Sequence, residues 1–396
     1  MFQDLQALPQ DPLLGLITQY RQDERTEKID LGVGVYKDAQ GLTPVLECVK
    51  TAEQLLLSNE DSKSYVGPSG NVQFSELMAK LVFAETYDKS LTHRLSSLQT
   101  PGGCGALRVL AELIARAAPI SSVWVSDPTW ANHVPLLGDA NIELKTYPYY
   151  DYQSKSIRFD EMIKSLENAL PGDVVLLHAC CHNPSGADLS EEQWRTIVNF
   201  LSDKKLVPLI DVAYQGFGAS LDNDAYGIRL AAENLDEVMV AVSCSKNFGL
   251  YRERVGCAFV LSKNTKHADA SKSHLLSIAR GIYSMPPSHG ASIVELILSS
   301  EELKGVWFKE LLSMRDRISQ MRDLVAENMR GLIGNDRFNF VARQSGMFSF
   351  LGIDEFQVKR LASDYGIYMA ANSRMSIAGL NENNMQYFSQ SLSRVL

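Results

Sequence analysis

Short apolar runs rich in β-branched residues alternate with longer segments of helical periodicity through the middle of the chain. The runs predict buried strands at residues 122–126, 141–146, 173–178, 206–211, 237–242 and 256–261. Apolar residues recur at helical spacing over residues 44–59, 72–87, 106–118, 159–169 and 190–203. Strands that alternate with helices in this way favour an α/β fold, with a mainly parallel sheet covered by helices on both faces.

The pattern changes beyond Ser300. A long charged helix is predicted from there to about Met329. Short strands near Phe340 and over 347–350 follow, and then a helix over 355–365 and further strands. This part of the chain therefore predicts a second, smaller α+β domain.

The beginning of the chain has little periodicity. Residues 1 to about 15 are predicted to form an arm, and residues 28–36 a short strand interrupted by glycines. Gly32 and Gly34 suggest a dinucleotide-binding loop. However, the third glycine and a following amphipathic helix are missing, so this interpretation is weak.

Composition and charge exclude several classes of protein. The chain has 396 residues, of which 45% are apolar and 21% charged, as in globular proteins. Its net charge of -9 argues against nucleic acid or an anionic membrane as the main partner, and no apolar stretch is long enough to span a bilayer. Six cysteines without Cys-x-x-Cys pairs, and an N-terminus without a signal peptide, favour a reducing cytoplasm.

Lys246 is the first candidate for chemistry. It follows the predicted strand 237–242, and strand ends in open α/β sheets are where ligands bind. An amine held there can form a Schiff base with a carbonyl, including that of pyridoxal phosphate. Arg254, further along the chain, is suited to a phosphate. On this stretch alone, a solvated lysine and arginine at a strand end explain the pattern equally well.

A glycine-rich turn at residues 100–105 leads directly into the predicted helix 106–118. Free backbone N–H groups at such a helix start can hold an anion at the positive end of the helix dipole. Taken alone, a tight turn that binds nothing is the more common outcome.

Asp211 ends another predicted strand, and Tyr214 follows it closely. A carboxylate at that place can keep a pyridinium nitrogen protonated, and the phenol can donate a hydrogen bond to an oxygen on the ring. Taken alone, a helix N-cap is the better explanation of Asp211.

His178, Cys180 and His182 point to one side of an extended chain, and all three are zinc-ligand types. No second group of ligands accompanies them, so packing in a buried strand is favoured and no metal site is predicted. Asn183, in the turn that follows, can donate its amide to an oxygen of a bound ring.

Three further side chains suit a planar, anionic ligand. Trp130, in a loop after a strand, can stack on a planar cofactor, although core burial also explains it. Arg374 lies among small and apolar residues, where an arginine needs an anion, either a substrate carboxylate or an internal acid. Arg280, before a Pro-Pro loop, can bind a second anion.

Together, these stretches resemble the class I aminotransferases of the aspartate and aromatic group, which use pyridoxal phosphate, over nearly the whole chain. The matching stretches are Gly34-Val-Tyr-Lys-Asp38, Thr100-Pro-Gly-Gly103, Cys181-His-Asn-Pro184, Asp211-Val-Ala-Tyr-Gln-Gly-Phe217, Ser243-x-Ser-Lys-Asn-Phe-Gly249 and Ser373-Arg-x-x-x-Ala-Gly379.

The resemblance implies fold type I of the pyridoxal-phosphate enzymes, with a mainly parallel seven-stranded sheet flanked by helices and a smaller α+β domain. It implies that residues 1–42 form the N-terminal arm and part of the small domain. Residues 43–313 would form the large cofactor-binding domain, and residues 314–396 the remainder of the small domain.

The resemblance also implies catalytic roles for Lys246, Asp211 and Tyr214. Lys246 would bind the cofactor aldehyde and then move a proton between the substrate Cα and the cofactor. Asp211 would pair with the pyridine nitrogen, and His178 would support Asp211 from behind. Asn183 and Tyr214 would bind the 3-oxygen of the ring.

Further implied contacts surround the ring. The ring would stack on Trp130, and the phosphate would be held by Gly102, Gly103, Cys104, Ser243, Arg254 and, from the other subunit of a homodimer, Tyr65. Arg374 would hold the substrate α-carboxylate, and Arg280 of the neighbouring subunit would meet a distal carboxylate. Gly34, Trp130 and Asn183 would complete the substrate site.

Departures from the family pattern bear on specificity. Cys104 stands where relatives carry Thr or Ser, and a thiol is the weaker donor. Met285 stands where aspartate-specific relatives have Asn, and its pliable apolar side chain suits aromatic rings. The stretches that resemble the bacterial aromatic-amino-acid aminotransferases more than the aspartate-specific ones are Cys244, Tyr251-Arg-Glu-Arg254 and Ser373-Arg-Met-Ser-Ile-Ala-Gly-Leu-Asn381.

The resemblance therefore implies reversible amino transfer from tyrosine, phenylalanine, tryptophan or aspartate to 2-oxoglutarate. An aspartate-preferring aminotransferase with weak aromatic activity is the nearest alternative. A β-lyase or decarboxylase that uses the same cofactor, and a non-catalytic binding protein on this fold, are more distant ones.

Overall fold

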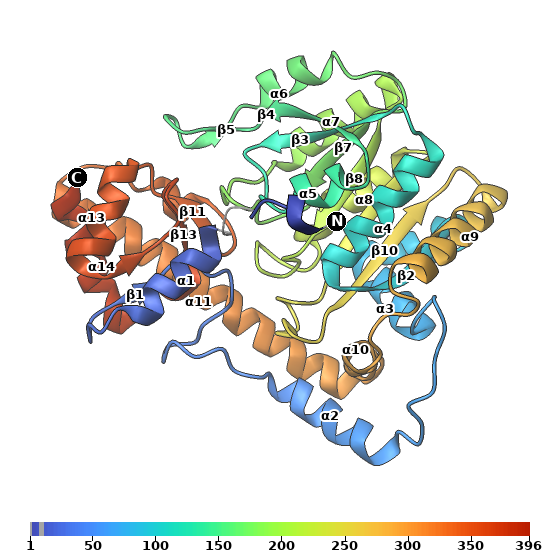
Figure 1. Cartoon of the computed structure of the whole chain (residues 1–396), viewed down its shortest axis with the longest axis horizontal. Coiled ribbons are helices and arrows are strands. Elements are labelled where there is room, and N and C mark those ends of the chain that lie inside the picture. Colours follow the sequence, from blue (N-terminus) through green and yellow to red (C-terminus); the bar gives the residue numbers. More distant parts are fainter. Residues whose placement is uncertain (1, 8–11) are drawn as a thin grey trace. The chain divides into compact units, whose positions relative to one another are not determined.

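The computed structural model describes residues 2–7 and 12–396 (Figure 1). Its contacts divide the chain into two compact units. Unit 1 contains Met1–Thr43 and Arg317–Leu396, and unit 2 contains Pro44–Asp316. The second boundary falls within one helix, α11 (Glu301–Ile333).

Unit 2 is built on a seven-stranded sheet with the order β2-β10-β9-β8-β7-β3-β4. The strands are β2 (Leu95–Pro101), β3 (Ser122–Asp127), β4 (Glu143–Pro148), β7 (Val174–His178), β8 (Val207–Val212), β9 (Val238–Ser243) and β10 (Val255–Leu261). All pairs from β9 to β4 are parallel, whereas β10 is antiparallel to both of its neighbours. The predicted mainly parallel sheet is confirmed.

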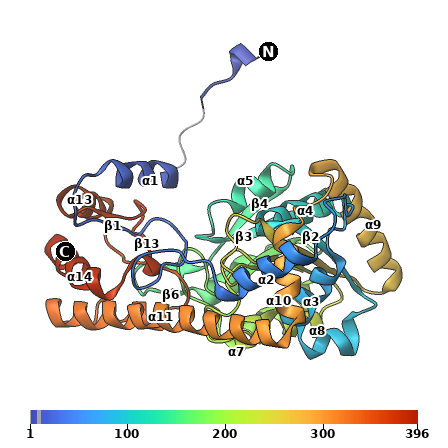
Figure 2. The same ribbon diagram turned by 90° about the horizontal axis from the view of Figure 1, so that it is seen from below.

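The central strands are apolar along most of their length because helices cover both faces of the sheet. Every residue of β9 and β10 is buried, as expected for strands without a solvated face. Helices α4 (Gly102–Ala117) and α9 (Thr265–Ile282) lie on one face, and α3 (Val72–Phe83), α7 (Glu191–Lys204) and α8 (Tyr226–Asn234) on the other (Figure 2).

The remaining elements of unit 2 are shorter or peripheral. They are α2 (Glu47–Asn59), α5 (His133–Gly138), α6 (Phe159–Leu166), α10 (His289–Ser299), the paired strands β5 (Tyr150–Asp151) and β6 (Ser156–Ile157), a π-helical turn η2 (Tyr87–Leu91) and a 3-10 turn η3 (Asn223–Ala225). Periodicity alone did not predict α8, α9, α10 or strand β2.

Helix α7 shows why its sequence folds locally as it does. The Ser190 hydroxyl accepts a hydrogen bond from the Gln193 N–H, and the Gln193 side chain accepts one from the Ser190 N–H. This capping box satisfies two backbone donors at the helix start. At the other end Lys205 adopts a left-handed conformation, with φ of 56°, and ends the helix.

Unit 1 contains two small sheets, one that pairs β1 with β12 in parallel and one that pairs β11 with β13 in antiparallel orientation. Its elements are η1 (Phe2–Asp4), α1 (Pro12–Gln22), β1 (Ile29–Asp30), α12 (Phe340–Arg343), β11 (Phe348–Phe350), α13 (Glu355–Tyr365), β12 (Ile367–Tyr368), β13 (Arg374–Ser376), η4 (Ile377–Gly379) and α14 (Glu382–Val395).

Several predictions for unit 1 were wrong. The segment at Phe340 is helical rather than extended. The predicted arm ends earlier, because α1 begins at Pro12; residues 1 and 8–11 of that arm lie outside the described residues. The strand predicted over 28–36 is only two residues long, because the chain turns at its glycines.

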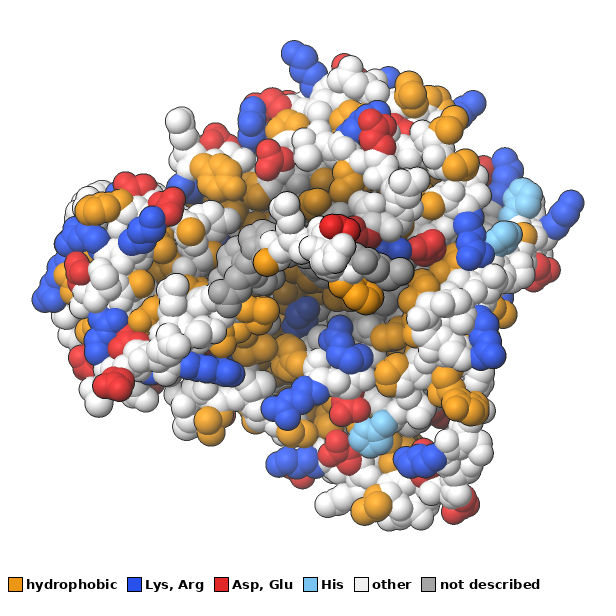
Figure 3. Space-filling model, in the orientation of Figure 1, with side chains coloured by type: hydrophobic (Ala, Val, Ile, Leu, Met, Phe, Trp, Pro, Cys, Tyr) orange, Lys and Arg blue, Asp and Glu red, His pale blue; other side chains and the backbone are white. Residues whose placement is uncertain are grey.

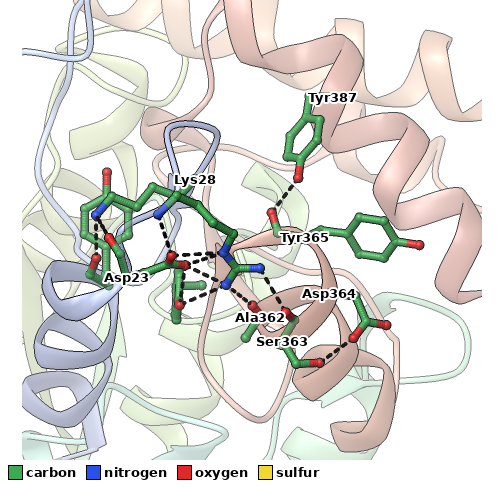
Figure 4. A network of polar contacts seen from close by, with 10 residues as sticks. Asp23, Lys28, Ala362, Ser363, Asp364, Tyr365 and Tyr387 are labelled. Carbon is green, nitrogen blue, oxygen red and sulfur yellow. Dashed lines mark hydrogen bonds and ion pairs between the residues drawn. The ribbon is translucent and has the colours of Figure 1, made fainter.

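A network of polar contacts ties the N-terminal part of unit 1 to helix α13 (Figure 4). The Arg25 guanidinium donates to the carbonyls of Ala362 and Ser363 in the last turn of α13, at 2.8 and 2.9 Å. It also donates to the Asp23 carboxylate, which keeps the pKa of Asp23 well below its ordinary value. A cation at this position complements the negative end of the helix dipole.

The surface carries charges of both signs. Acidic and basic side chains are interspersed on the face seen in Figure 3. Among the described helices, none has the length and apolar character needed to cross a membrane.

Candidate active site

Most of the candidate residues of unit 2 come together at one edge of its sheet. Strands β3, β7, β8 and β9 are parallel, so their C-terminal ends share that edge. Strand β10 runs the other way and brings its start there. The side chains in the last residues of these strands, just after them, or just before β10 are Trp130, Asn183, Asp211, Tyr214, Ser243, Lys246 and Arg254. We call this group the sheet-edge cluster.

Lys246 lies largely buried within this cluster. Burial lowers the pKa of its amine, and the nearby Arg254 lowers it further, while Asp211 opposes the shift. The amine lies 4.9 Å from the centroid of the Tyr214 ring. A lowered pKa makes the neutral, nucleophilic form of an amine easier to reach.

The loop that carries Lys246 is anchored from behind by helix α11. The Trp307 indole N–H donates to the Asn247 carbonyl at 2.7 Å. The same indole stacks on the Phe248 ring, with centroids 4.6 Å apart and planes 5° from parallel. Two fully buried rings therefore fix the backbone on the C-terminal side of Lys246.

The Asp211 carboxylate is paired with His133. Its Oδ2 lies 3.1 Å from His133 Nε2. Burial alone would raise the pKa of Asp211, but this hydrogen bond and the nearby imidazoles and Lys246 outweigh burial and lower it. The carboxyl group is thus ionised at neutral pH although it is buried.

The sequence had assigned a supporting role behind Asp211 to His178, whose imidazole also helps to lower the pKa of Asp211, and the structure adds His133 as the hydrogen-bond partner. His178 is the register partner of Asp211 on the adjacent strand, but its ring contacts Thr129 and His133 instead. His133 begins the short helix α5, after the loop that contains Trp130. The sequence identified that loop as a candidate through Trp130. It gave no reason to prefer the histidine of the loop, because a sequence does not show which distant side chains a loop after a strand can contact.

Thr129 connects the two imidazoles. Its hydroxyl lies 2.8 Å from His133 Nδ1 and 3.4 Å from His178 Nε2. His133 donates from Nε2 to the Asp211 carboxylate, and the Thr129 hydroxyl lies within hydrogen-bonding distance of both imidazoles.

A row of aromatic rings continues from this point into the core. The rings of His178 and His182 are 4.2 Å apart, and the His182 ring stacks on Tyr149 at 4.1 Å. Burial lowers the pKa of His178 to about 3 and that of His182 well below its ordinary value. Both imidazoles therefore stay neutral in the folded protein down to acid pH.

This burial predicts a pH-dependent stability that the variant His178→Gln should reduce. Above pH 6.5 the imidazole of His178 is neutral in both the folded and the unfolded chain, so it adds no pH dependence. Below pH 6.5 only the unfolded chain takes up the proton, so stability falls as pH falls toward about 3. Between pH 6.5 and 5 the wild type should lose about 2 kcal/mol more than the variant.

Urea unfolding at pH 7.5 and pH 5 measures this difference. His93→Gln, at an exposed position, controls for the loss of one histidine. An equal pH dependence in the wild type and His178→Gln would show that His178 is protonated in the folded protein.

One group of possible metal ligands occurs among the described residues, and it differs from the set considered in the sequence. The ligand atoms of Cys180, Cys181 and Asp224 lie within 4.8 Å of one another. However, the Asp224 carboxylate already accepts from the N–H groups of Gly216 and Gly218, at 2.8 and 2.9 Å. The contact with Cys181 and burial raise the pKa of the Cys180 thiol. These contacts are better explained as stabilisation of the loop after Tyr214 than as a metal site.

The start of helix α4 forms a cradle beside Arg254. Gly102 has φ of 71°, and a Cβ atom there would lie 2.7 Å from Arg254 Nη2. A Cβ atom at Gly103 would lie 2.9 Å from Ser243 Cβ. Only glycine allows this close approach, which leaves the first N–H groups of α4 beside a guanidinium.

Arg254 itself makes only neutral contacts in this cradle. Its Nη1 donates to the Tyr251 carbonyl at 3.0 Å and to the Ser245 hydroxyl at 3.5 Å, and no carboxylate of the described residues forms an ion pair with it. A helix start and a guanidinium with no counter-charge together favour a bound anion such as a phosphate.

The remaining sequence candidates in unit 2 surround the same edge. The Asn183 amide is buried, and its Oδ1 has no hydrogen-bond partner, as expected for a group that a ligand satisfies. Trp130 is half-buried and packs edge-to-face on His133 at 5.2 Å. The Cys104 thiol accepts a long contact from the Asn132 amide at 3.8 Å.

Two of the predicted site residues, Tyr65 and Arg280, are exposed and make none of the contacts described above. Tyr65 lies in the loop after α2 and is 93% exposed. Arg280, in the last turn of α9, is also exposed, and its Nη1 donates to the Ser284 hydroxyl at 2.5 Å.

Arg374 and Gly34 meet within unit 1. The Arg374 guanidinium lies over the Phe348 ring, 4.6 Å from its centroid, and its Nη2 donates to the Gly32 carbonyl at 2.9 Å. A Cβ atom at Gly34 would lie 2.5 Å from the same ring. Gly34 therefore makes room for the aromatic ring on which Arg374 rests.

The residues of the sheet-edge cluster, together with the glycines at the start of helix α4, fit pyridoxal phosphate. The cradle of Gly102, Gly103 and Arg254 suits the phosphate, and the Asp211 carboxylate suits a protonated ring nitrogen. The buried Lys246 amine suits an aldehyde. The Asn183 Oδ1, which has no partner, can accept a hydrogen bond from a donor on the ligand.

Comparisons with known proteins agree with this chemistry. The family model "Aminotransferase class I and II" matches residues 26–392. The chain is 44% identical over 396 residues to the aspartate aminotransferase of Escherichia coli K12, with both chains covered completely. It is also 44% identical over 394 residues to the aromatic-amino-acid aminotransferase of Pseudomonas aeruginosa, covering 100% of this chain and 98% of that one.

A solved structure shares the fold. The aromatic-amino-acid aminotransferase from Burkholderia pseudomallei, covalently bound to pyridoxal phosphate, superposes with a TM-score of 0.98 at 38% identity. The match covers 100% of this chain and 99% of that one. The resemblance and the fold expected from the sequence are confirmed, and the chain belongs to the class I and II aminotransferase family.

Proposed function

We propose that the protein is an aromatic-amino-acid aminotransferase with pyridoxal phosphate as its cofactor. It transfers the amino group of tyrosine, phenylalanine, tryptophan or aspartate reversibly to 2-oxoglutarate, giving glutamate and a 2-oxo acid. The observation that carries the proposal is the buried Lys246 amine, with its lowered pKa, in one cluster with the ionised Asp211. An amine nucleophile and a carboxylate partner for a ring nitrogen are what this cofactor chemistry requires.

When bound, pyridoxal phosphate supplies an aldehyde and an electron-withdrawing ring that stabilises negative charge at the substrate Cα. Lys246 would hold the aldehyde carbon through its amine, and as a free amine it would move the proton of the substrate Cα. Asp211 keeps the ring nitrogen protonated, and His133 holds the Asp211 carboxylate in place. Tyr214 and Asn183 donate to the 3-oxygen of the ring.

The rest of the cluster orients the ring. Trp130 packs on the ring face. The phosphate is held by Gly102, Gly103, Cys104, Ser243 and Arg254. Among these contacts Cys104 contributes least, because a thiol is a weak donor.

Substrate binding uses two arginines. Arg374 binds the α-carboxylate with its planar fork, beside Gly34. The neighbouring subunit of a homodimer supplies Arg280 for the distal carboxylate of aspartate or 2-oxoglutarate, and Tyr65 for the phosphate. The exposure of both side chains within one chain supports this assignment.

The proposal also includes the domain division and the place of action. Residues 43–313 act as the cofactor domain, and residues 1–42 and 314–396 act as the smaller domain. The enzyme works in the cytoplasm.

An aspartate-preferring aminotransferase is the second candidate. The chain is as similar to the aspartate enzyme of E. coli as to the aromatic enzyme of P. aeruginosa, so identity does not separate them. Met285 favours the aromatic assignment, because a flexible apolar side chain accommodates aromatic rings better than Asn does.

Replacing Arg280 by alanine tests the assignment of the distal pocket. The variant should lose about 100-fold in kcat/KM for aspartate, because a charge-assisted hydrogen bond is removed. With phenylalanine, which has no distal carboxylate, kcat/KM should change by less than about threefold. The measurement is glutamate formation from each amino acid and 2-oxoglutarate, with pyridoxal phosphate added.

Arg195→Ala, at an exposed arginine of helix α7, is the control and should leave both values unchanged. Equal losses for both substrates in Arg280→Ala would refute the role of Arg280. A wild type that forms no glutamate from any of the amino acids would refute the proposed function.

A further inference from the structure

Arg322 is a buried arginine of helix α11 with an unusual set of acceptors. It is 2% exposed and lies in unit 1. Its Nη1 donates to the Val341 carbonyl at 2.9 Å. Its Nη2 donates to the carbonyls of Ser345, Gly346 and Phe348, at 2.9, 2.7 and 2.6 Å, and its Nε donates to the Gly346 carbonyl at 3.0 Å.

These bonds hold the chain between helix α12 and strand β11 in one conformation. The carbonyls of four residues within eight positions turn toward a single guanidinium. Gly346 has φ of 75°, which lets the backbone turn there. Five N–H donors in one rigid plane can serve converging carbonyls, whereas the three donors of a lysine ammonium at one point cannot reach all of them.

The last of these carbonyls belongs to the residue that supports Arg374. The Phe348 backbone accepts from Arg322, and the Phe348 ring lies beneath the Arg374 guanidinium. Strand β11 also pairs with β13, which places Phe350 opposite Arg374. A shift of the segment at Phe348 would therefore move both the ring and the strand that determine where the guanidinium lies.

We infer that Arg322 is a positioning residue for the amino acid substrate, which acts through Phe348 on Arg374. The inference rests on the proposed function, in which Arg374 binds the α-carboxylate. Every amino acid and 2-oxo acid substrate has that carboxylate. Loss of the Arg322 contacts should therefore weaken the binding of aromatic and dicarboxylic substrates alike, whereas loss of Arg280 should affect only the dicarboxylic ones.

The variant Arg322→Lys tests this inference, because it keeps the charge and removes the planar fork. We expect KM to rise about tenfold for both phenylalanine and aspartate, while kcat changes by less than about threefold. The dissociation constant of 3-phenylpropanoate, which carries a carboxylate and a ring but no amine, should rise by the same factor in calorimetry. The absorbance of the bound cofactor should not change, because the sheet-edge cluster belongs to unit 2.

A second variant and a control separate positioning from general stability. Gly346→Ala strains the residue whose carbonyl accepts two of the Arg322 bonds, and it should produce the same rise in KM if Arg322→Lys does not fold. Arg25→Lys, which disturbs the other set of arginine–carbonyl bonds in unit 1, should lower the melting temperature without changing KM.

Arg374→Lys separates failure of this inference from failure of the proposed function. If Arg374→Lys leaves KM unchanged, the proposed carboxylate site is wrong. If Arg374→Lys raises KM but folded Arg322→Lys or Gly346→Ala does not, only the role of Arg322 is wrong. A rise confined to aspartate would also overturn the role of Arg322.

Discussion

Replacing Lys246 by alanine should lower kcat by about 10⁴-fold or more, because the residue acts as both nucleophile and proton carrier. Its amine is buried beside Asp211, and burial lowers its pKa. The residues proposed to hold the phosphate, such as Gly102 and Arg254, are untouched by the change. The variant should therefore still bind the cofactor, without the covalent link to the protein.

The comparison uses steady-state kcat for phenylalanine together with the absorbance spectrum after borohydride treatment and denaturation. Borohydride fixes the cofactor to a lysine, so the wild type should keep the label and Lys246→Ala should not. Lys272→Ala is a matched control, because burial also lowers the pKa of that lysine and it lies in the same unit. A variant of Lys246 that keeps more than a tenth of the wild-type kcat would contradict the assignment.

Replacing Asp211 by asparagine should lower kcat by about 10³-fold, with a smaller effect on cofactor affinity. The amide has nearly the same shape as the carboxylate but carries no charge to keep a ring nitrogen protonated. The amide oxygen can still accept the hydrogen bond from His133. The variant therefore loses the negative charge of residue 211 but keeps its position. Asp211→Glu, which keeps the charge, should recover part of the lost rate.

Asp173→Asn is the matched control for the loss of a buried carboxylate from the same sheet. Asp173 precedes strand β7, at the opposite end of that strand from the edge at which Asp211 lies. It accepts hydrogen bonds from the Trp124 indole and the Ser122 backbone, at 3.0 Å each. This control should lose stability but keep kcat. A kcat of Asp211→Asn within tenfold of the wild type would refute the pairing of Asp211 with a ring nitrogen.

Local sequence features predicted the elements of the fold best where capping and periodicity agreed. Helix α13 has the predicted bounds, Glu355–Tyr365, because Asp354 forms a capping box with Gln357 and Gly366 takes the left-handed conformation that ends the helix. Helix α14 was not predicted although it also has a capping box, formed by Asn381 and Asn384. The capping box is present in the sequence of α14, but asparagine at both of its positions makes it harder to recognise.

The candidate site was predictable in outline because its residues follow consecutive strands. The carboxyl ends of parallel strands share one edge, so residues such as Asn183, Asp211 and Lys246 must lie near one another once the sheet is parallel. The resemblance to a family then supplied a role for each of them.

By itself, the sequence determined the strands of the large sheet except β2, the helices α2, α3, α4, α6 and α7 of unit 2, and the residue types that gather at the sheet edge, because these depend on local periodicity and on the common direction of the strands. Only the tertiary structure decided which histidine contacts Asp211, since His133 and Asp211 lie on segments far apart in the chain. It also decided that the segment at Phe340 is helical and wraps around Arg322. Such contacts depend on distances between segments that fold independently, and no periodicity in the chain encodes those distances.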